Sequence, residues 1–531
     1  MTGRLTLTWA NKDRALLSHG ESGYEWVDRD DPRVREVRLL DEVGRVGDVT
    51  GTARDNLLIR GDSLDALRAL VHTPELAAEY RGKVKLVYID PPFNTGQAFE
   101  HYDDSLEHSV WLGMMRERLT LIKELLSPDG SVWVHLDDAE MAYCKVLMDE
   151  IFGRQNFIAT VVWQKRYSRE NRSALGSVHD SVLVYAPLGA DWRKVRNRLE
   201  REGAKEYRNP NNDPRGPWRL VPMTAQGFRP NQMYEIVAPN GKVHVPPKGR
   251  CWGLLEDRYL ALLSEGRVKF GANGNGQPGV LRYFDEDQGL VPWSWWTHDE
   301  VGHNDESKKE MFGLFAEEDA FTTPKPERLL QRVIHIGSNP GDIVLDCFAG
   351  SGTTAAVAHK MGRRWVTVEL SENTADTFTK PRLEKVVAGA DPGGITQSAE
   401  WVGGGGFRDL RIAESTWQVH ESPPGNETFL REGIDGSTVR RAVAAQLGYE
   451  LIEHPVFVAE RGRSRLAVID GVVDATVVAD VVAALADGQT ALVAGLSVTD
   501  DAASTLRDLN KGSRVVRVPG DLFPRNSAVT R

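Results

Sequence analysis

The sequence has little cysteine, no long apolar run and no excess of glycine or proline. Three cysteines (Cys144, Cys251 and Cys347) among 531 residues, without a Cys-x-x-Cys pair, exclude a disulfide framework and a zinc knuckle and fit a reducing cytoplasm. Fifty glycines and 26 prolines are too few for a collagen-like or low-complexity chain. Apolar stretches stay shorter than the ~18 residues that cross a bilayer, and the first residues lack a secretion signal. We therefore expect no membrane segment and a cytoplasmic protein.

Charge is spread unevenly along the chain. The formal net charge is -11, yet the segment from Arg193 to Arg282 holds 17 lysine or arginine residues against 8 acidic ones. A net charge averages over domains and can hide a local basic face. This segment predicts an anionic partner in spite of the acidic total.

Apolar strands and amphipathic helices alternate in the first third of the chain. A short strand, a turn and a helix fill 56–70, a buried strand fills 83–90, and a long helix fills 108–130 before the strand 131–137. This alternation predicts an α/β fold with a mostly parallel sheet covered on both faces.

The alternation also suggests domain boundaries. It lapses in a loop-rich basic stretch and resumes with a helix, a strand, a Gly-rich turn and another helix before a run of glycines at 403–406. We therefore expect an N-terminal arm (1–50), a core in two parts (51–192 and 301–400) around an inserted module (193–300), a linker (401–429) and a small acidic α/β domain (430–531).

A Gly-rich turn follows one of the buried strands. The strand 343–345 runs into Asp346, and Gly350-x-Gly352 then opens a helix, so a nucleoside can approach the backbone closely. The next strand ends in Glu369, a carboxylate suited to accept both ribose hydroxyls of an adenosine. The same pattern fits a dinucleotide fingerprint or a purely structural turn. A phosphate-binding P-loop is excluded because no Lys-Ser/Thr pair follows the glycines.

The tetrad Asp90-Pro91-Pro92-Phe93 ends another buried strand. Prolines can simply end a strand because they donate no ladder hydrogen bond. The tetrad also suits an amine substrate: Asp90 accepts from one N–H, the prolines hold the chain rigid, and Phe93 offers a face on which a flat base stacks.

These two motifs resemble those of DNA amino-methyltransferases that use S-adenosylmethionine. The acceptor motif precedes LDCFAGSGTT with a large insertion between them, as in the permuted beta class. GDSLDAL, IDPPFNTG, VHDSVLVYA, NDPRGPWR and TPKPERLL, between about residues 5 and 385, are similar to the modification subunits of type III restriction systems. The resemblance implies a permuted Rossmann-like methyltransferase sheet with an inserted target-recognition domain.

The resemblance also implies roles for individual residues. Asp90 and the Pro91 carbonyl would accept the two amino hydrogens of adenine, and Phe93 would stack on the flipped base. The expected catalytic set is Asp90, Pro91, Pro92 and Phe93. The expected cofactor-binding set is Asp62, Asp90, Lys325, Pro326, Asp346, Phe348, Gly350, Gly352 and Glu369. No metal is expected.

The resemblance and the basic segment together define the expected partners. In the inserted module, Arg215, Arg219 and Arg250, called the insert arginines below, are expected to contact DNA, since arginine binds phosphates and guanine edges. We expect S-adenosylmethionine as cofactor, double-stranded DNA as substrate, a homodimer, and a restriction endonuclease subunit as a further partner.

Several other functions fit part of the sequence. A cytosine-N4 methyltransferase shares the motifs, although Ser usually replaces Asp90 there. A non-catalytic DNA-recognition subunit for a nuclease would keep the fold. A protein or RNA methyltransferase is a further option, although protein-glutamine enzymes of this fold typically carry Asn in place of Asp90. A nicotinamide-dependent oxidoreductase explains the Gly-rich turn and Glu369 but leaves Asp90 to Phe93 and the basic insertion unexplained.

Overall fold

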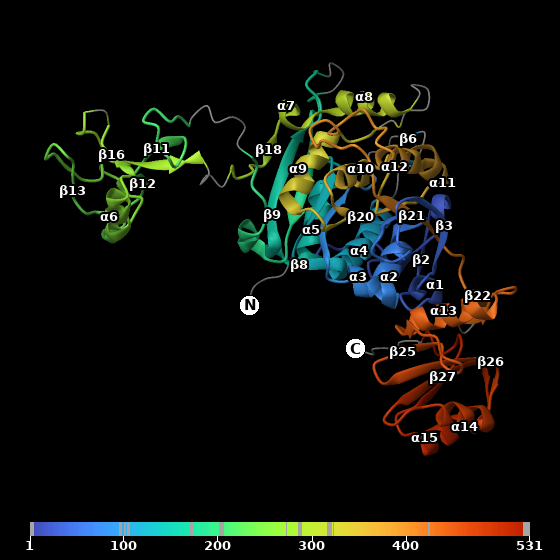
Figure 1. Cartoon of the computed structure of the whole chain (residues 1–531). Coiled ribbons are helices and arrows are strands. Elements are labelled where there is room, and N and C mark those ends of the chain that lie inside the picture. Colours follow the sequence, from blue (N-terminus) through green and yellow to red (C-terminus); the bar gives the residue numbers. More distant parts are fainter. Residues whose placement is uncertain are drawn as a thin grey trace. The chain divides into compact units, whose positions relative to one another are not determined.

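The computed structural model describes residues 5–94, 98–99, 102–103, 107–169, 174–200, 207–271, 273–284, 289–315, 321, 323–422 and 425–523. The chain divides into two compact units, Met1–Asn197 with Trp293–Arg531 and Arg198–Pro292 (Figure 1). Within the described part of the chain, no helix has the length and apolar character needed to cross a membrane.

A ten-stranded sheet forms the centre of the larger unit. Six consecutive strands, from β8 (Leu126–Leu136) to β21 (Gly406–Ile412), run parallel to one another. On one side of them β10 (His179–Tyr185) is antiparallel to β8 and to β9 (Phe157–Gln164), and on the other side β3 (Leu40–Gly47) is antiparallel to β21. This arrangement confirms the predicted α/β class with a mostly parallel sheet. In spatial order the strands are β18 (Trp295–Trp296), β9 (Phe157–Gln164), β10 (His179–Tyr185), β8 (Leu126–Leu136), β5 (Val84–Ile89), β19 (Ile343–Asp346), β20 (Arg364–Glu369), β4 (Asn56–Arg60), β21 (Gly406–Ile412) and β3 (Leu40–Gly47).

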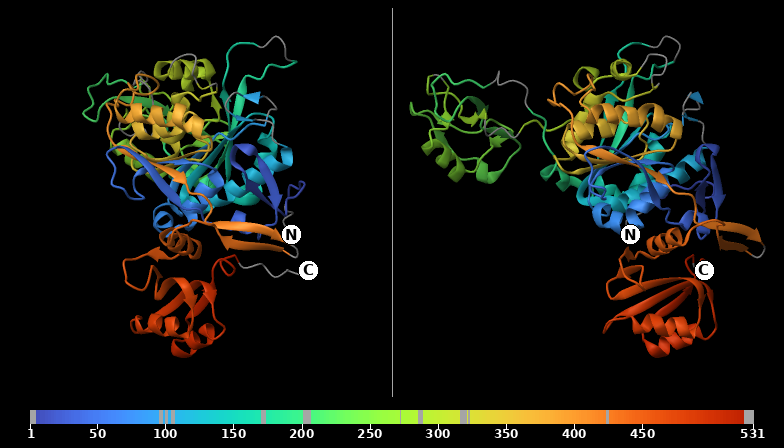
Figure 2. Two further views of the ribbon diagram at one scale, coloured as in Figure 1. Left: turned by 90° about the vertical axis from the view of Figure 1, so that its right-hand side faces the viewer. Right: turned by 45° about the vertical axis from the view of Figure 1, so that its right-hand side comes forward.

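Two groups of helices cover this sheet. The inner strands are apolar runs, as in β5 (VKLVYI), where five of six residues are buried, so both faces of the sheet need cover. The first group is α2 (Ser63–His72), α4 (His108–Leu125) and α5 (Met141–Met148), and the second is α9 (Glu327–Gly337), α10 (Thr353–Lys360) and α12 (Lys380–Val387). Figure 2 shows them on either side of the strands, the first in blue and the second in yellow and orange.

Segments far apart in the chain become neighbours in the sheet. Strand β19 pairs with β5 in parallel, with Val344 opposite Leu86. The strand that leads to the Gly-rich turn therefore lies directly beside the strand that leads to Asp90.

Three sequence expectations differ from the structure in detail. The helix predicted to end near Gly130 stops at Leu125, and β8 begins at Leu126, because Pro128 disfavours helical geometry in the residue before it.

The predicted linker 401–429 contains β21, which pairs with β4 and β3, so this segment belongs to the sheet. The glycines before it suggested a linker, yet Gly403, Gly404 and Gly405 form a positive-φ turn that leads into the strand. Strand β3 likewise shows that the predicted N-terminal arm supplies an edge strand.

The unit Arg198–Pro292 has a core of its own. Buried residues such as Met223, Trp252, Tyr259 and Leu262 pack together between short strands and one helix. The elements are β11 (Trp218–Pro222), β12 (Thr224–Gln226), β13 (Ile236–Val237), β14 (Val243–His244), β15 (Arg250–Trp252), α6 (Glu256–Ser264), β16 (Val268–Lys269) and β17 (Gly279–Tyr283).

The C-terminal part of the chain forms a second, smaller sheet. Strands β26, β27 and β28 are parallel, and β24 and β25 add antiparallel partners at one side. This sheet lies in the segment 430–531, for which the sequence predicts a small α/β domain, and it is part of the larger of the two compact units. Its elements are α13 (Gly436–Leu447), β24 (Glu450–Leu451), β25 (Ala459–Arg461), β26 (Ser464–Val473), α14 (Ala475–Ala483), β27 (Thr490–Val498), α15 (Ala502–Leu509) and β28 (Arg514–Arg517).

Candidate active site

Four neighbouring parallel strands bring four carboxylates to one edge of the sheet. Strands β5, β19, β20 and β4 lie side by side in that order. Asp90 follows β5, Asp346 and Glu369 are the last residues of β19 and β20, and Asp62 follows β4. Ligands of open α/β sheets bind outside these carboxyl ends. All four side chains line one pocket of about 890 Å³.

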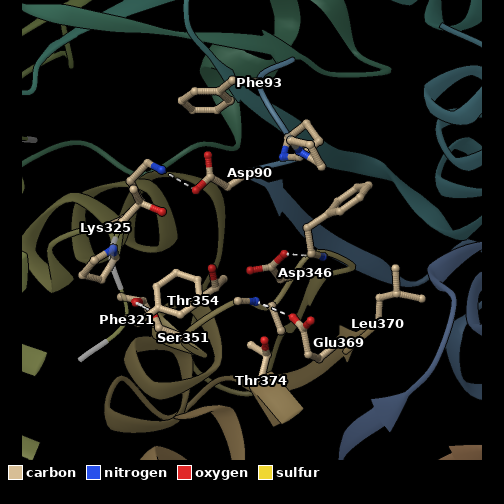
Figure 3. Close-up of a pocket in the computed structure, with 18 of the residues that line it drawn as sticks. Asp90, Phe93, Phe321, Lys325, Asp346, Ser351, Thr354, Glu369, Leu370 and Thr374 are labelled. Atoms are coloured by element: carbon tan, nitrogen blue, oxygen red, sulfur yellow. Dashed lines mark hydrogen bonds and ion pairs between the residues drawn. The ribbon is translucent and has the colours of Figure 1, made fainter. Parts of the chain in front are cut away.

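Glu369 and Asp346 hold the Gly-rich turn between them. The Gly350 N–H donates to Glu369 Oε2 at 2.8 Å, and the Phe348 N–H donates to Asp346 Oδ1 at 3.0 Å (Figure 3). Burial raises the pKa of Glu369 to about 7, and burial likewise raises the pKa of Asp346 to about 7. Both groups therefore change charge close to neutral pH, as groups at functional sites often do.

Glycine is required in this turn. Gly350 has a φ of +50°, and a Cβ there would lie 3.3 Å from the ring of Phe321. Gly352 has a φ of +75° and is the N-cap of α10. Gly350 and Phe348 line the pocket, whereas Gly352 shapes the turn from outside the lining.

Asp62 caps α2 and faces the same pocket. Its Oδ1 accepts from the Leu64 N–H and from Arg118 Nη2, both at 2.7 Å. Its Oδ2 is buried and has no hydrogen-bond partner among the residues that the structure describes. A buried, unsatisfied carboxylate oxygen is costly, so this atom is suited to accept from a ligand donor.

The tetrad from Asp90 to Phe93 lies on the other side of the pocket. The Pro92 carbonyl accepts from the Trp111 indole N–H at 2.7 Å, which fixes the course of the loop. Asp90 Oδ1 is buried and finds no hydrogen-bond partner within the described part of the chain. All four residues of the tetrad line the pocket.

Lys325 lies against this tetrad. Its Nζ forms an ion pair with Asp90 Oδ2 and lies 5.1 Å from the centroid of the Phe93 ring (Figure 3). The sequence resemblance assigned Lys325 to the cofactor, whereas its contacts here are with the acceptor tetrad. Pro326, next in the chain, is the N-cap of α9 and does not line the pocket.

Sequence reasoning missed a hydrogen-bonded chain behind Phe93. His135 on β8 is fully buried and stacks on Phe93 with ring centroids 5.9 Å apart. Its Nδ1 lies 2.7 Å from the Tyr88 hydroxyl, and its Nε2 lies 3.2 Å from Asp180 Oδ2. Burial opposes ionisation of Asp180, but His135 and then Lys165, whose Nζ is 2.6 Å from Oδ1, bring its pKa to about 2.

A sequence pattern could have pointed to this chain. Tyr88 on β5 lies two residues before Asp90, and side chains two apart in extended chain share a face. His135 interrupts the otherwise apolar run SVWVHL of β8, where a polar side chain needs a buried partner. In the described residues, no group of three His, Cys, Asp or Glu side chains is arranged to hold a metal ion.

The insert arginines belong to the smaller unit. Arg215 pairs with Asp213, with Nη2 and Oδ2 2.9 Å apart, so part of its charge is already offset. Arg219 on β11 lies 5.4 Å from the Tyr207 ring centroid, and Arg250 Nη2 on β15 donates to the Thr224 carbonyl at 3.1 Å.

Comparison with protein families identifies the chain. The model of the N6/N4 methyltransferase family, described as DNA methylase, matches residues 84–380, which is more than half of the sequence. The match includes both Asp90 and the Gly-rich turn. The protein belongs to this family of DNA methylases.

Individual relatives agree with this membership. The StyLTI Mod subunit, a type III restriction-modification enzyme of Salmonella typhimurium strain LT2, is 31% identical over 415 residues, 68% of this chain and 61% of that protein. The type II methyltransferase M.EcaI of Enterobacter cloacae is 30% identical over 307 residues, 56% of this chain and 64% of that protein. The chain thus spans less than two thirds of the length of either relative.

A likeness to solved structures is weaker. The PvuII DNA methyltransferase, which is cytosine-N4-specific, aligns with 64% of this chain and 90% of its own, at 15% identity and a TM-score of 0.34. A likeness of this size carries no argument about the site.

Proposed function

We propose that the protein transfers a methyl group from S-adenosylmethionine to N6 of adenine in double-stranded DNA. The observation that carries the proposal is the meeting of the Asp90 tetrad and the Gly-rich turn in one pocket, at the ends of adjacent strands. Membership of the DNA methylase family supports the substrate class.

The pocket fits the cofactor by its hydrogen-bond acceptors. Glu369 offers carboxylate oxygens for ribose hydroxyls, and Asp62 Oδ2 is a buried acceptor without a partner in the described structure. When bound, S-adenosylmethionine supplies an electrophilic methyl group on a sulfonium. Gly350 lets the backbone approach the nucleoside.

The acceptor half of the pocket fits a flat amine. Asp90 Oδ1 is buried and has no partner in the described ranges, so it can accept one amino hydrogen and orient the nitrogen lone pair. Phe93 offers a stacking face, backed by His135. Positive charge grows on the amine nitrogen during the transfer, and the Asp90 carboxylate stabilises it. We assign adenine rather than cytosine because the residue at position 90 is Asp.

We further propose that the protein is the modification component of a type III-like restriction-modification system. The similarity to the StyLTI Mod subunit supports this assignment. For such a component we propose a homodimer, a restriction endonuclease subunit as partner, and a location in the cytoplasm, where the DNA lies. The smaller unit, with its basic composition and the insert arginines, is the proposed target-recognition module.

The test is methyl transfer by the purified chain. Tritium from labelled cofactor should appear in duplex DNA, and nucleoside analysis should find N6-methyladenine. Single-molecule sequencing of genomic DNA from cells with and without the gene then gives the recognition sequence. N4-methylcytosine in place of N6-methyladenine would refute the base assignment, and tight DNA binding without any transfer would favour a non-catalytic recognition subunit.

A further inference from the structure

Lys325 brings an ammonium group to the two side chains that are proposed to hold the target amine. We propose that Lys325 stands in for this amine in the DNA-free protein, and that the flipped base must displace it from Asp90. The inference rests on the proposed function and assigns a competing occupant to the acceptor half of the site.

The contacts of Lys325 match those expected of an aminopurine. Its Nζ donates to Asp90 Oδ2, as the amino group of a base would donate to this carboxylate. The ammonium also lies 5.1 Å from the Phe93 ring centroid, the distance at which a cation is attracted to an aromatic face. Lys325 and Asp90 are 11% and 23% exposed, so the pair is only weakly screened by water.

The charge of Lys325 opposes the proposed reaction while the ion pair persists. Methyl transfer leaves positive charge on the amine nitrogen, and the Asp90 carboxylate stabilises that charge only when another cation does not already neutralise it. The Lys325–Asp90 ion pair therefore gives the carboxylate a partner while no DNA is bound, but the ion pair has to break before methyl transfer.

The anchoring of the backbone limits the motion to the side chain. Two residues after Lys325, the buried carboxylate of Glu327 accepts from Lys360 Nζ at 2.7 Å, from Arg382 Nη2 at 2.8 Å and from the Ile395 N–H at 2.9 Å. This network holds the start of α9 in place. The flexible four-carbon stem of Lys325 can still swing the ammonium away.

Asp90 offers a route for the exchange. In the described structure, Oδ1 is buried without a hydrogen-bond partner while Oδ2 pairs with Lys325. An incoming amine can therefore bind Oδ1 first and displace the ammonium afterwards, so the carboxylate is never left without a donor.

The test is the affinity of the full chain for a duplex that holds the recognition sequence. Removing a lysine from a DNA-binding surface normally weakens binding. Lys325→Met should instead lower the Kd for site-containing DNA, by about ten-fold, because a charge-assisted hydrogen bond no longer competes. Lys308→Met is the matched control, since Lys308 is exposed and lines the same pocket without an ion pair to Asp90 in the described structure; its Kd should rise. An unchanged or raised Kd for Lys325→Met overturns the inference.

A second measurement needs no DNA and covers the case in which Lys325→Met does not fold. Reductive methylation followed by mass spectrometry should label Lys325 slowly in the wild-type chain and about ten-fold faster in Asp90→Asn, which weakens the charged partner. Lys308 should label equally in both. Equal labelling of Lys325 in the two proteins overturns the ion pair and with it the inference.

If the wild-type chain methylates DNA and Lys325→Met weakens binding, only the inference fails; if the wild type transfers no methyl group, the proposed function fails first.

Discussion

The pH dependence of cofactor binding tests the proposed role of Glu369. The Gly350 N–H and the Ser371 N–H donate to its two oxygens at 2.8 and 3.0 Å. Burial raises its pKa to about 7, so a neutral carboxylic acid and a carboxylate coexist near neutral pH. Only the carboxylate can keep both backbone bonds and also accept from two ribose hydroxyls. Cofactor affinity should therefore rise with pH.

The size of the effect follows from the pKa. A group with a pKa of about 7 is ionised to about one tenth at pH 6 and to about nine tenths at pH 8. If binding requires the ionised form, Kd should fall by about ten-fold over that interval. Calorimetry with S-adenosylhomocysteine, which keeps the ribose, measures it at pH 6, 7 and 8 and constant ionic strength.

Two variants separate Glu369 from its neighbour. Glu369→Gln should weaken binding at pH 8 by roughly ten-fold or more, since a charged hydrogen bond contributes ~1.5–3 kcal/mol, and should flatten the pH profile. Asp346, whose pKa burial also raises to about 7, accounts for any slope that remains, so Asp346→Asn should remove that part. A wild-type Kd that is constant from pH 6 to 8, or a Glu369→Gln slope equal to the wild-type slope, refutes the role.

Three further predictions concern the rest of the site. Asp90→Ala should abolish methyl transfer and leave the Kd for S-adenosylhomocysteine within a few-fold, because it removes the amine acceptor only; near wild-type transfer would show that the active site lies elsewhere. His135→Ala should lower kcat and base extrusion, read from 2-aminopurine fluorescence at the target position, because Phe93 loses its support; His135→Asn should restore part of both, and equal loss in the two variants would contradict a hydrogen-bonded positioning role. Neutralising the insert arginines should reduce the slope of log K against log salt by at most about three, at ~0.9 for each of three phosphate contacts, and by less where an arginine already pairs within the module, as Arg215 does with Asp213; an unchanged slope would place DNA binding outside this module.

The sequence predicted the functional residues at the strand ends, but it did not predict the buried residues that hold them in position. Asp90, Asp346 and Glu369 each close an apolar run, and such runs mark buried strands whose carboxyl ends meet at one edge. Nothing in the local sequence states that the strand before Asp90 pairs with the strand before the Gly-rich turn. Only the resemblance to a permuted methyltransferase family indicated that the two motifs lie close together.

Long-range partners explain what was missed. His135 is held by Tyr88 and Asp180, which lie on two other strands, so its position depends on the order of strands in the sheet rather than on sequence spacing. The linker prediction failed because glycine-rich composition does not distinguish a flexible connection from a turn that leads into a strand. Strand β21 is recognised only through its pairing with β4 and β3.

The points at which the chain leaves and re-enters the larger unit bear on how such proteins diversify. The chain leaves the larger unit after Asn197, which donates to Ile336, and re-enters it at Trp293 to form β18 beside β9. Both points are fixed by contacts inside the larger unit, and the entropic cost of a longer excursion between them grows only with the logarithm of its length. Recombination can therefore replace the excursion with one of a different size without changing the register of any inner strand. If the excursion is the target-recognition module that we propose, such a replacement changes the DNA specificity and leaves the pocket as it is.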